Sequence, residues 1–210
     1  VRDYRSPDFD VQRAVAANTA ALGETLDRAK RAGIGRIVCT GTVAEPGEGG
    51  GDAPERAMSP YGLSKFLTWE ALRTEVQAAG LPLGKFIIPN PFGRFEQERY
   101  CSYLIACWAK GEIAQVRTPT YIRDNIPIDK LARAYADFAL LAPGDPRAGS
   151  CRPSGYTGSQ ADFTARFARE IGSRLAIGTP YELLERDDFS EPLTRINSDA
   201  VAPGWDEGRF

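Results

Sequence analysis

The sequence contains no histidine and only one methionine, Met58. Without histidine, this chain cannot by itself build a Ser-His-Asp or Cys-His catalytic centre, and it lacks a usual zinc ligand. Proton transfer must therefore fall to tyrosine, lysine, aspartate, glutamate or cysteine. The four cysteines show no CxxC spacing in a chain of 210 residues, which predicts reduced, mostly buried thiols rather than a disulfide framework. We expect no metal site.

A concentration of charge of one sign is also missing. The 26 basic and 28 acidic residues are interleaved and give a net charge of -2, so the basic stripe of a nucleic-acid-binding surface is not present. No apolar run approaches the roughly 20 residues of a membrane span, and nothing resembles a signal peptide. We therefore expect a cytoplasmic protein without nucleic-acid or membrane partners, in one large domain or one domain with a small second lobe.

The first half alternates between helix and strand patterns. Apolar residues at helical spacing predict a helix over residues 11–32, ended by Gly33, and a short apolar strand follows at residues 37–40. Ser59 and Pro60 predict the start of a second helix that runs to Gly80, and Leu83 to Ile88 is strand-like. This alternation with short connections predicts a parallel α/β sheet.

The second half is less regular. Tyr100 to Lys110 is typical of a helix ended by Gly111, and two strands are expected at residues 114–116 and 121–128. Asp129 is placed to cap a helix that runs to Leu141. Ser159, with Asp162 three positions later, resembles a capping box for a helix to Ile171. The proline-rich and charged residues 180–210 give no firm pattern.

Tyr61 and Lys65 form the first candidate for chemistry. Residues four apart share one helix face, so the phenol and the ammonium group would project into the same space. A free tyrosine titrates near pH ~10, and a neighbouring cation lowers the pKa of the phenol. The pair could take a proton from a hydroxyl or return one to a ketone. The plain alternative is a chance pair on a solvated helix, since such spacing occurs in roughly one chain in five.

A series of motifs extends this observation. In order along the chain, they are Val38-Cys39-Thr40-Gly41-Thr42, Ser59-Pro60-Tyr61-Gly62-Leu63-Ser64-Lys65, Asn90-Pro91-Phe92-Gly93 and Arg123-Asp124-Asn125-Ile126. This series resembles the extended short-chain dehydrogenase/reductase family of NAD(P)-dependent sugar-nucleotide epimerases and dehydratases. Asn18 also matches the helical asparagine of that family. The similarity spans nearly the entire chain and is weakest after about Pro180.

The resemblance implies a Rossmann-like, doubly wound parallel sheet with a small C-terminal substrate-binding lobe. Residues 1–92 would form the C-terminal half of the cofactor domain, to which residues 121–150 return. Residues 93–120 and 151–210 would form the lobe. The glycine-rich dinucleotide fingerprint of the family is missing from the sequence, and about 80 residues would precede this chain in a relative. We therefore expect the chain to be a fragment of a longer protein.

The family's catalytic roles map onto three residues. The resemblance makes Tyr61 the acid/base and also a cofactor contact. It makes Lys65 the group that holds the cofactor ribose and lowers the tyrosine pKa. Thr42 would orient the reacting sugar oxygen, although a strand-end threonine can instead satisfy local backbone groups. Thr40 is a second candidate for this hydroxyl and a cofactor contact, and Pro89 is a further expected cofactor contact.

Two more residues would hold the nucleotide-sugar. Asn90 aligns with an amide that binds the substrate, and Arg123 aligns with a guanidinium suited to a diphosphate. Asn90 could also be a turn residue before Pro91. For Arg123 the alternative is an ion pair with Asp124 or another carboxylate.

The sequence departs from relatives at two further places. Val43 and Ala44 follow Thr42, where the 4,6-dehydratases of the family have an Asp-Glu pair, so dehydration is disfavoured. Pro127 replaces a common histidine, and we assign no mechanistic meaning to this change.

Residues 47–51 are glycine-rich but lack the Lys and Ser/Thr of a P-loop, which favours a mobile loop over the substrate.

The predicted function is an oxidoreductase or epimerase that uses NAD or NADP on a nucleotide-activated sugar. It would reduce a keto-sugar or epimerise through a transient ketone. The alternative is a non-catalytic family member that binds a nucleotide or a protein. Relatives commonly dimerise through the two helices that correspond to residues 11–32 and 60–79, so the resemblance also implies a homodimer.

Overall fold

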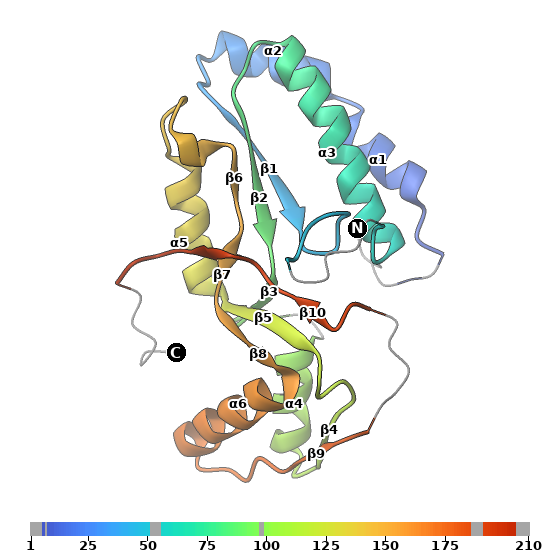
Figure 1. Ribbon diagram of the computed structural model, residues 1–210, viewed down its shortest axis with the longest axis vertical. Helices are drawn as coiled ribbons and strands as arrows, with labels where there is room; N and C mark the ends of the chain where they lie inside the picture. Colours follow the sequence, from blue (N-terminus) through green and yellow to red (C-terminus); the bar gives the residue numbers. More distant parts are fainter. Residues whose placement is uncertain (1–5, 7, 51–55, 97–98, 186–190, 205–210) are drawn as a thin grey trace.

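The computed structural model of the protein describes residues 6, 8–50, 56–96, 99–185 and 191–204 (Figure 1). Three helices and two long strands lie at one end of the longest axis. A second sheet crosses the middle, and a helical lobe lies at the other end. The predicted α/β class with parallel strands is confirmed. None of the described helices is long and apolar enough to cross a membrane.

The first sheet has the strand order β1-β2-β6 and is parallel throughout. Strand β1 (Ile37–Thr42) runs beside β2 (Leu83–Ile88), with Thr42 opposite Ile88 at their carboxyl ends. Strand β6 (Ser150–Cys151) pairs with the other edge of β2. The carboxyl ends of parallel strands are where α/β proteins bind ligands, so the end of β1 is a natural site.

Helix α3 (Pro60–Ala78) connects β1 to β2, as predicted. Its cap is the predicted Ser59, whose hydroxyl oxygen accepts a hydrogen bond from the backbone N–H of Gly62 at 3.1 Å. The chain leaves the helix at Gly80, where a φ of 71° suits glycine. The cap at Ser59 therefore places Tyr61 and Lys65 within the first two turns of α3.

The helix predicted over residues 11–32 is wrong in one respect, because it is two helices, α1 (Val11–Thr19) and α2 (Leu22–Arg31). At the break, the backbone of Ala21 leaves the helical conformation, with a φ of -112° and a ψ of 19°. Helix α1 packs along α3 (Figure 1), and the Asn18 amide donates to the Thr68 hydroxyl at 3.4 Å.

The two faces of the first sheet differ in chemistry. Phe86 faces α5 (Ile128–Ala139) and packs with Leu131 and Phe138 in an apolar core. Lys85, on the opposite face, lies 5.3 Å from the ring centroid of Trp69 on α3. The predicted cap of α5 is wrong: the helix begins at Ile128, so Asp129 lies within its first turn, where its charge still complements the helix dipole.

The second sheet is built around β5 (Ile122–Pro127). Strand β8 (Tyr156–Ser159) runs antiparallel along one edge of β5. Along the other edge, β10 (Thr194–Arg195) and β3 (Asn90–Phe92) lie one after the other, both parallel to β5. Two short strands join the sheets, since β7 (Pro153–Ser154) pairs with β11 (Asp199–Ala200) between them.

The lobe contains α4 (Tyr100–Ala109), α6 (Gln160–Leu175) and the parallel pair β4 (Ala114–Val116) and β9 (Tyr181–Leu183). Its core is aromatic and aliphatic, with Phe92, Leu104, Trp108, Phe163 and Phe167. Ser159 caps α6 as predicted, accepting from the Asp162 N–H at 3.0 Å, but the helix continues four residues beyond Ile171 to Leu175. The four cysteines are free, as expected.

Candidate active site

The start of α3 packs directly on the loop after β1. The backbone N–H of Met58 donates to the Ala44 carbonyl oxygen at 3.2 Å, and a Cβ atom added at Gly62 would collide with that same oxygen. Only glycine at the second position of Tyr61-Gly62 permits this approach. The contact brings the helix turn that carries Tyr61 and Lys65 to the strand end that carries Thr42.

We expect Gly62→Ala to separate these two segments. Overpacking against a backbone carbonyl typically costs about 1–3 kcal/mol, more than the ~1 kcal/mol that alanine gains over glycine within a helix. Urea denaturation should therefore show a less stable protein, and turnover should fall because Tyr61 moves.

Gly23→Ala on α2 is the matched control, since nothing lies within 4 Å of its Cβ position. This variant should be as stable as the parent or up to about 1 kcal/mol more stable. A Gly62→Ala protein that behaves like Gly23→Ala would refute the close packing.

The two candidate hydroxyl groups on β1 have different surroundings. The Thr42 oxygen accepts a long bond from the Ala44 N–H at 3.4 Å, and the Thr42 N–H donates to Glu45 Oε1 at 2.8 Å. The Thr40 hydroxyl lies 2.8 Å from the Tyr135 hydroxyl of α5. The local backbone contact named as the alternative for Thr42 is thus present, whereas Thr40 is directed to the α5 face. Pro89 is buried between β2 and β3.

The α3 face of the sheet brings Lys65 near Cys39. Burial raises the pKa of the Cys39 thiol, the charges of Lys65 and Lys85 oppose this shift, and Glu45 adds to it. The thiol therefore stays protonated near neutral pH, which disfavours Cys39 as a nucleophile. Tyr61, one turn before Lys65, packs edge-on against Phe9, with ring centroids 6.1 Å apart.

Beneath the loop after Thr42 lies a buried charge cluster, which we define as Glu45, Glu48, Lys85 and Arg152. Lys85 Nζ is 2.6 Å from Glu45 Oε2 and 3.0 Å from Glu48 Oε1. Arg152 Nε lies 2.9 Å from Glu48 Oε2. Glu45 is fully buried, and its other oxygen binds the Thr42 N–H, so the cluster fixes the strand end.

Sequence reasoning missed this cluster, although a lysine inside the apolar strand Leu83 to Ile88 was a signal for it. The cluster also bears on the glycine-rich loop. Among its described residues, Glu48 is held by ion pairs and the Gly49 carbonyl oxygen accepts from the Ile196 N–H at 2.5 Å. These residues are packed against the protein rather than open over a cleft.

A polar face of the second sheet gathers the predicted substrate-binding residues. Asn90 is in register with Asn125, and Arg123 is in register with Arg195. Residues in register project from the same face of a sheet, as do residues two apart on one strand. All four side chains therefore share one face. Asn125 and Arg195 were not predicted, and a two-residue strand in the irregular tail gave no signal for Arg195.

Arg123 is only 5% exposed and is bonded on several sides. One guanidinium nitrogen donates to the carbonyl oxygens of Ile122, Pro192 and Leu193, and the other to Glu191 Oε2 at 3.1 Å. Burial, and then the charge of Arg195, lowers the pKa of Arg123 to about 10, against the opposing effect of Glu191. The ion pair named as the alternative is thus present with Glu191, and substrate binding by Arg123 stays a prediction.

Asp124 takes a different role on the opposite face of β5. It is fully buried, and its oxygens accept from the N–H groups of Gly155 at 2.7 Å and Asn197 at 3.1 Å. Burial raises the pKa of Asp124, while these backbone bonds oppose the shift. Arg123 therefore lies on the polar face, whereas Asp124 on the opposite face links β5 to Gly155 and Asn197.

Two contacts connect the segment that carries Arg195 to the chain between β1 and α3. Arg195 approaches Met58 Sδ at 3.5 Å, and Ile196 binds Gly49. Met58 lies three residues before Tyr61. The catalytic and substrate-binding candidates, which are far apart in sequence, therefore lie on neighbouring segments of one region.

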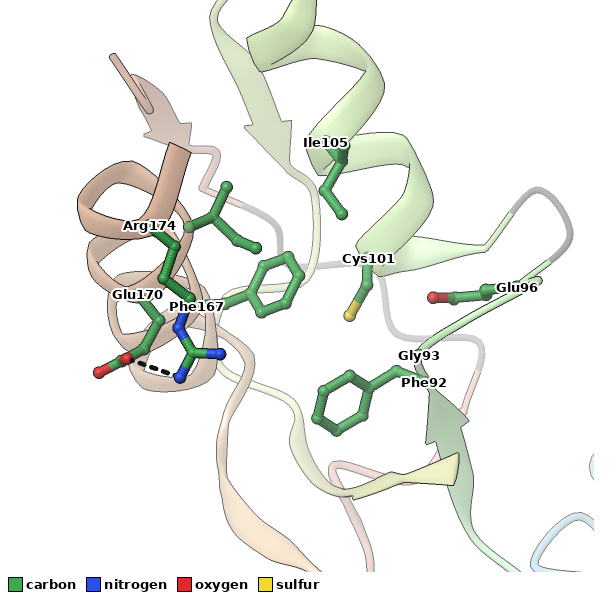
Figure 2. A pocket seen from close by; sticks show the side chains of 9 residues that line it. Phe92, Gly93, Glu96, Cys101, Ile105, Phe167, Glu170 and Arg174 are labelled. Carbon is green, nitrogen blue, oxygen red and sulfur yellow. Dashed lines mark ion pairs between the residues drawn. The ribbon is translucent and has the colours of Figure 1, made fainter. Parts of the chain in front are cut away.

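A cavity of about 210 Å³ lies elsewhere, between β3, α4 and α6 (Figure 2). Figure 2 shows Phe92, Phe167 and the Cys101 sulfur lining it, with the Glu170–Arg174 ion pair on α6. Burial raises the pKa of the Cys101 thiol well above its usual value, so it stays protonated. None of the predicted site residues lines this cavity.

A sequence profile described as the NAD dependent epimerase/dehydratase family matches residues 9–146, more than half of the chain. The chain belongs to this family. A search of curated protein sequences found no match.

Solved structures support the fold of this family member. The UDP-N-acetylglucosamine 4-epimerase of Methanobrevibacter ruminantium M1 is similar with a TM-score of 0.66 and 16% identity, over 94% of this chain and 63% of that one. The UDP-glucuronic acid 4-epimerase of Bacillus cereus, solved with UDP-glucuronic acid and NAD, gives 0.65 and 16%, over 88% and 59%. WbmH of Bordetella bronchiseptica, solved with NAD+, gives 0.62 and 19%, over 92% and 62%. The chain thus spans less than two thirds of these structures.

Proposed function

We propose that this epimerase/dehydratase family protein acts on a nucleotide-activated sugar with NAD or NADP, as an epimerase or a keto-sugar reductase. One observation carries the proposal. The helix turn with Tyr61 and Lys65 packs on the strand end with Thr42, and the polar face with Asn90 and Arg123 is connected to the same region. A sugar hydroxyl and a diphosphate are the groups that these two parts suit.

The residues of this chain fit the nicotinamide end of a dinucleotide. The parallel carboxyl ends of β1 and β2 supply the edge of the sheet, and Lys65 and Tyr61 supply a cation and a hydroxyl four residues apart beside it. Pro89 would add a further contact, and Thr40 stays a predicted cofactor contact although its hydroxyl lies on the α5 face beside Tyr135. The bound nicotinamide would accept and return a hydride. The phosphate-binding fingerprint is not found in this sequence.

The proton chemistry falls to the side chains. Tyr61 would take the proton of the reacting sugar hydroxyl and return it to the ketone, while the Lys65 charge stabilises the phenolate. Thr42 would donate a hydrogen bond to the same sugar oxygen, and its backbone is held for this by Glu45. Without acidic residues at Val43 and Ala44, loss of water from the sugar is disfavoured.

A direct test is thermal-shift titration of the purified protein with NAD(H) and NADP(H), followed by product analysis with UDP-sugars. We expect saturable stabilisation by one of the two cofactors and formation of an epimer or a reduced sugar. A protein that binds a nucleotide-sugar yet never changes it would instead favour the non-catalytic alternative.

We further propose a cytoplasmic homodimer formed through residues 11–32 and 60–79, which comprise α1, α2 and α3. On α3, Leu63 and Leu67 are 38% and 40% exposed and lie one turn apart. Paired copies of such a helix face would bury these leucines in a four-helix interface.

A further inference from the structure

Arg123 and Arg195 form an unusual pair for a protein interior. They are in register on adjacent parallel strands, and their side chains are only 6% and 15% exposed. Like charges placed side by side in a sheet are destabilising, and burial increases the cost. A stable fold therefore needs an anion between them.

Among the residues that the structure describes, the Glu191 carboxylate faces both arginines. Glu191 Oε2 lies 3.1 Å from one guanidinium nitrogen of Arg123 and 3.3 Å from one of Arg195. Within the described part of the chain, one carboxylate charge therefore faces two guanidinium charges. The pKa of Arg195, like that of Arg123, is lowered by burial, with Glu191 acting in the opposite direction.

Two buried N–H donors without hydrogen-bond partners lie in or beside this pair among the described residues. Within the described part of the chain, buried Arg195 Nε has no hydrogen-bond partner, and neither does Asn125 Nδ2 in a residue that is 7% exposed. Asn125 lies two residues after Arg123 on the same face of β5. Buried donors without partners are costly, and a ligand with several acceptor oxygens would satisfy them.

We propose that Glu191 is an internal stand-in for the substrate's diphosphate, which displaces it from Arg123 and Arg195. The proposal rests on the function proposed above and adds Arg195 as a second diphosphate contact. Glu191 suits displacement because its side chain is 39% exposed, whereas both arginines are buried. A diphosphate brings more negative charge and more acceptors than one carboxylate, so it can hold both guanidinium groups at once. The carboxylate then turns to solvent, and substrate binding starts with an exchange of anions.

The test is Glu191→Gln, which keeps the shape of the side chain and removes its charge. Isothermal titration calorimetry should show that UDP binds this variant at least about threefold more tightly, because it no longer competes with a carboxylate. Uridine, which lacks phosphate, should bind both proteins equally. Glu170→Gln is the matched control, since the Glu170 side chain is also 39% exposed and also pairs with an arginine, Arg174. It should leave UDP affinity unchanged.

The other outcomes are equally informative. Unchanged UDP affinity in Glu191→Gln would overturn the displacement, and weaker affinity would show that Glu191 only holds the arginines in place. If the unaltered protein binds no UDP, the proposed function fails, and inorganic pyrophosphate becomes the probe. Tighter pyrophosphate binding by Glu191→Gln would then retain the anion exchange, and equal or weaker binding would refute it.

Discussion

Replacement of Tyr61 by phenylalanine should remove most turnover while the protein still binds its nucleotide-sugar. The change deletes one hydroxyl, the only group that the proposed mechanism uses to move the sugar proton. General acid–base groups typically contribute about 10²- to 10⁴-fold, and we expect kcat to fall within that range. The ring remains, so its edge-on packing against Phe9 is kept. Steady-state kinetics and calorimetric binding of the substrate would separate these effects.

Tyr103→Phe provides the control. Tyr103 lies on α4, and its hydroxyl accepts from the Gln115 N–H at 2.8 Å. Loss of this hydroxyl should reduce stability by about 1 kcal/mol and leave kcat unchanged. Equal turnover in Tyr61→Phe and the parent would show that Tyr61 is not the acid/base. The proposed mechanism would then be refuted.

Replacement of Lys85 by methionine should have the largest effect on stability. Lys85 compensates two buried carboxylates, and Glu45 is entirely inaccessible to solvent. Breaking a buried ion pair by removing one partner typically costs about 3–5 kcal/mol, because a charge is left uncompensated. Urea denaturation should show this loss, and the strand end that carries Thr42 should lose order with it, since Glu45 binds the Thr42 N–H.

A double variant distinguishes the charge from the packing. Adding Glu45→Gln to Lys85→Met removes the uncompensated charge and should restore part of the lost stability, while Glu48 keeps Arg152 as its partner. Lys30→Met on the exposed surface of α2 should change stability by less than about 0.5 kcal/mol. If the double variant does not recover stability, the stability lost in Lys85→Met comes from lost packing and not from an uncompensated charge.

Helix caps and apolar runs in the sequence correctly predicted the helices and the strand that they define. Ser59 and Ser159 cap their helices in the structure, and Leu83 to Ile88 forms the expected strand. The break between α1 and α2 was missed because it lies in the backbone of Ala21, which leaves the helical conformation while the apolar residues on both sides keep helical spacing. The strands of residues 180–204 were missed for another reason. Each is two or three residues long and exists only through its pairing with an earlier strand.

The residues of the candidate site also fall into two groups, those that motifs predicted and those that only the structure shows. Tyr61, Lys65 and Asn90 were identified from motifs because each lies within a contiguous, recognisable segment. Asn125 lies within the motif Arg123-Asp124-Asn125-Ile126 but was given no role, and Arg195 lies outside every motif. Strand register between distant parts of the chain brings both residues to the polar face. Glu191, the partner of Arg123, was likewise out of reach of local reasoning, because no spacing rule joins residues 68 positions apart.

The course of folding follows from the pairing of the last strands. Asn197 donates to the carbonyl oxygens of Ile87 and Pro153, so its amide joins strands of both halves across 110 and 44 positions of sequence. Contacts of such separation carry a high loop-closure entropy and form late in folding. Strands β1 and β2 and the helix α3 between them can assemble from contacts closer in sequence, whereas the arginine pair exists only once residues 191–204 have docked. A folding intermediate without that segment would therefore contain Tyr61, the proposed acid/base, and would lack the proposed diphosphate-binding arginine pair.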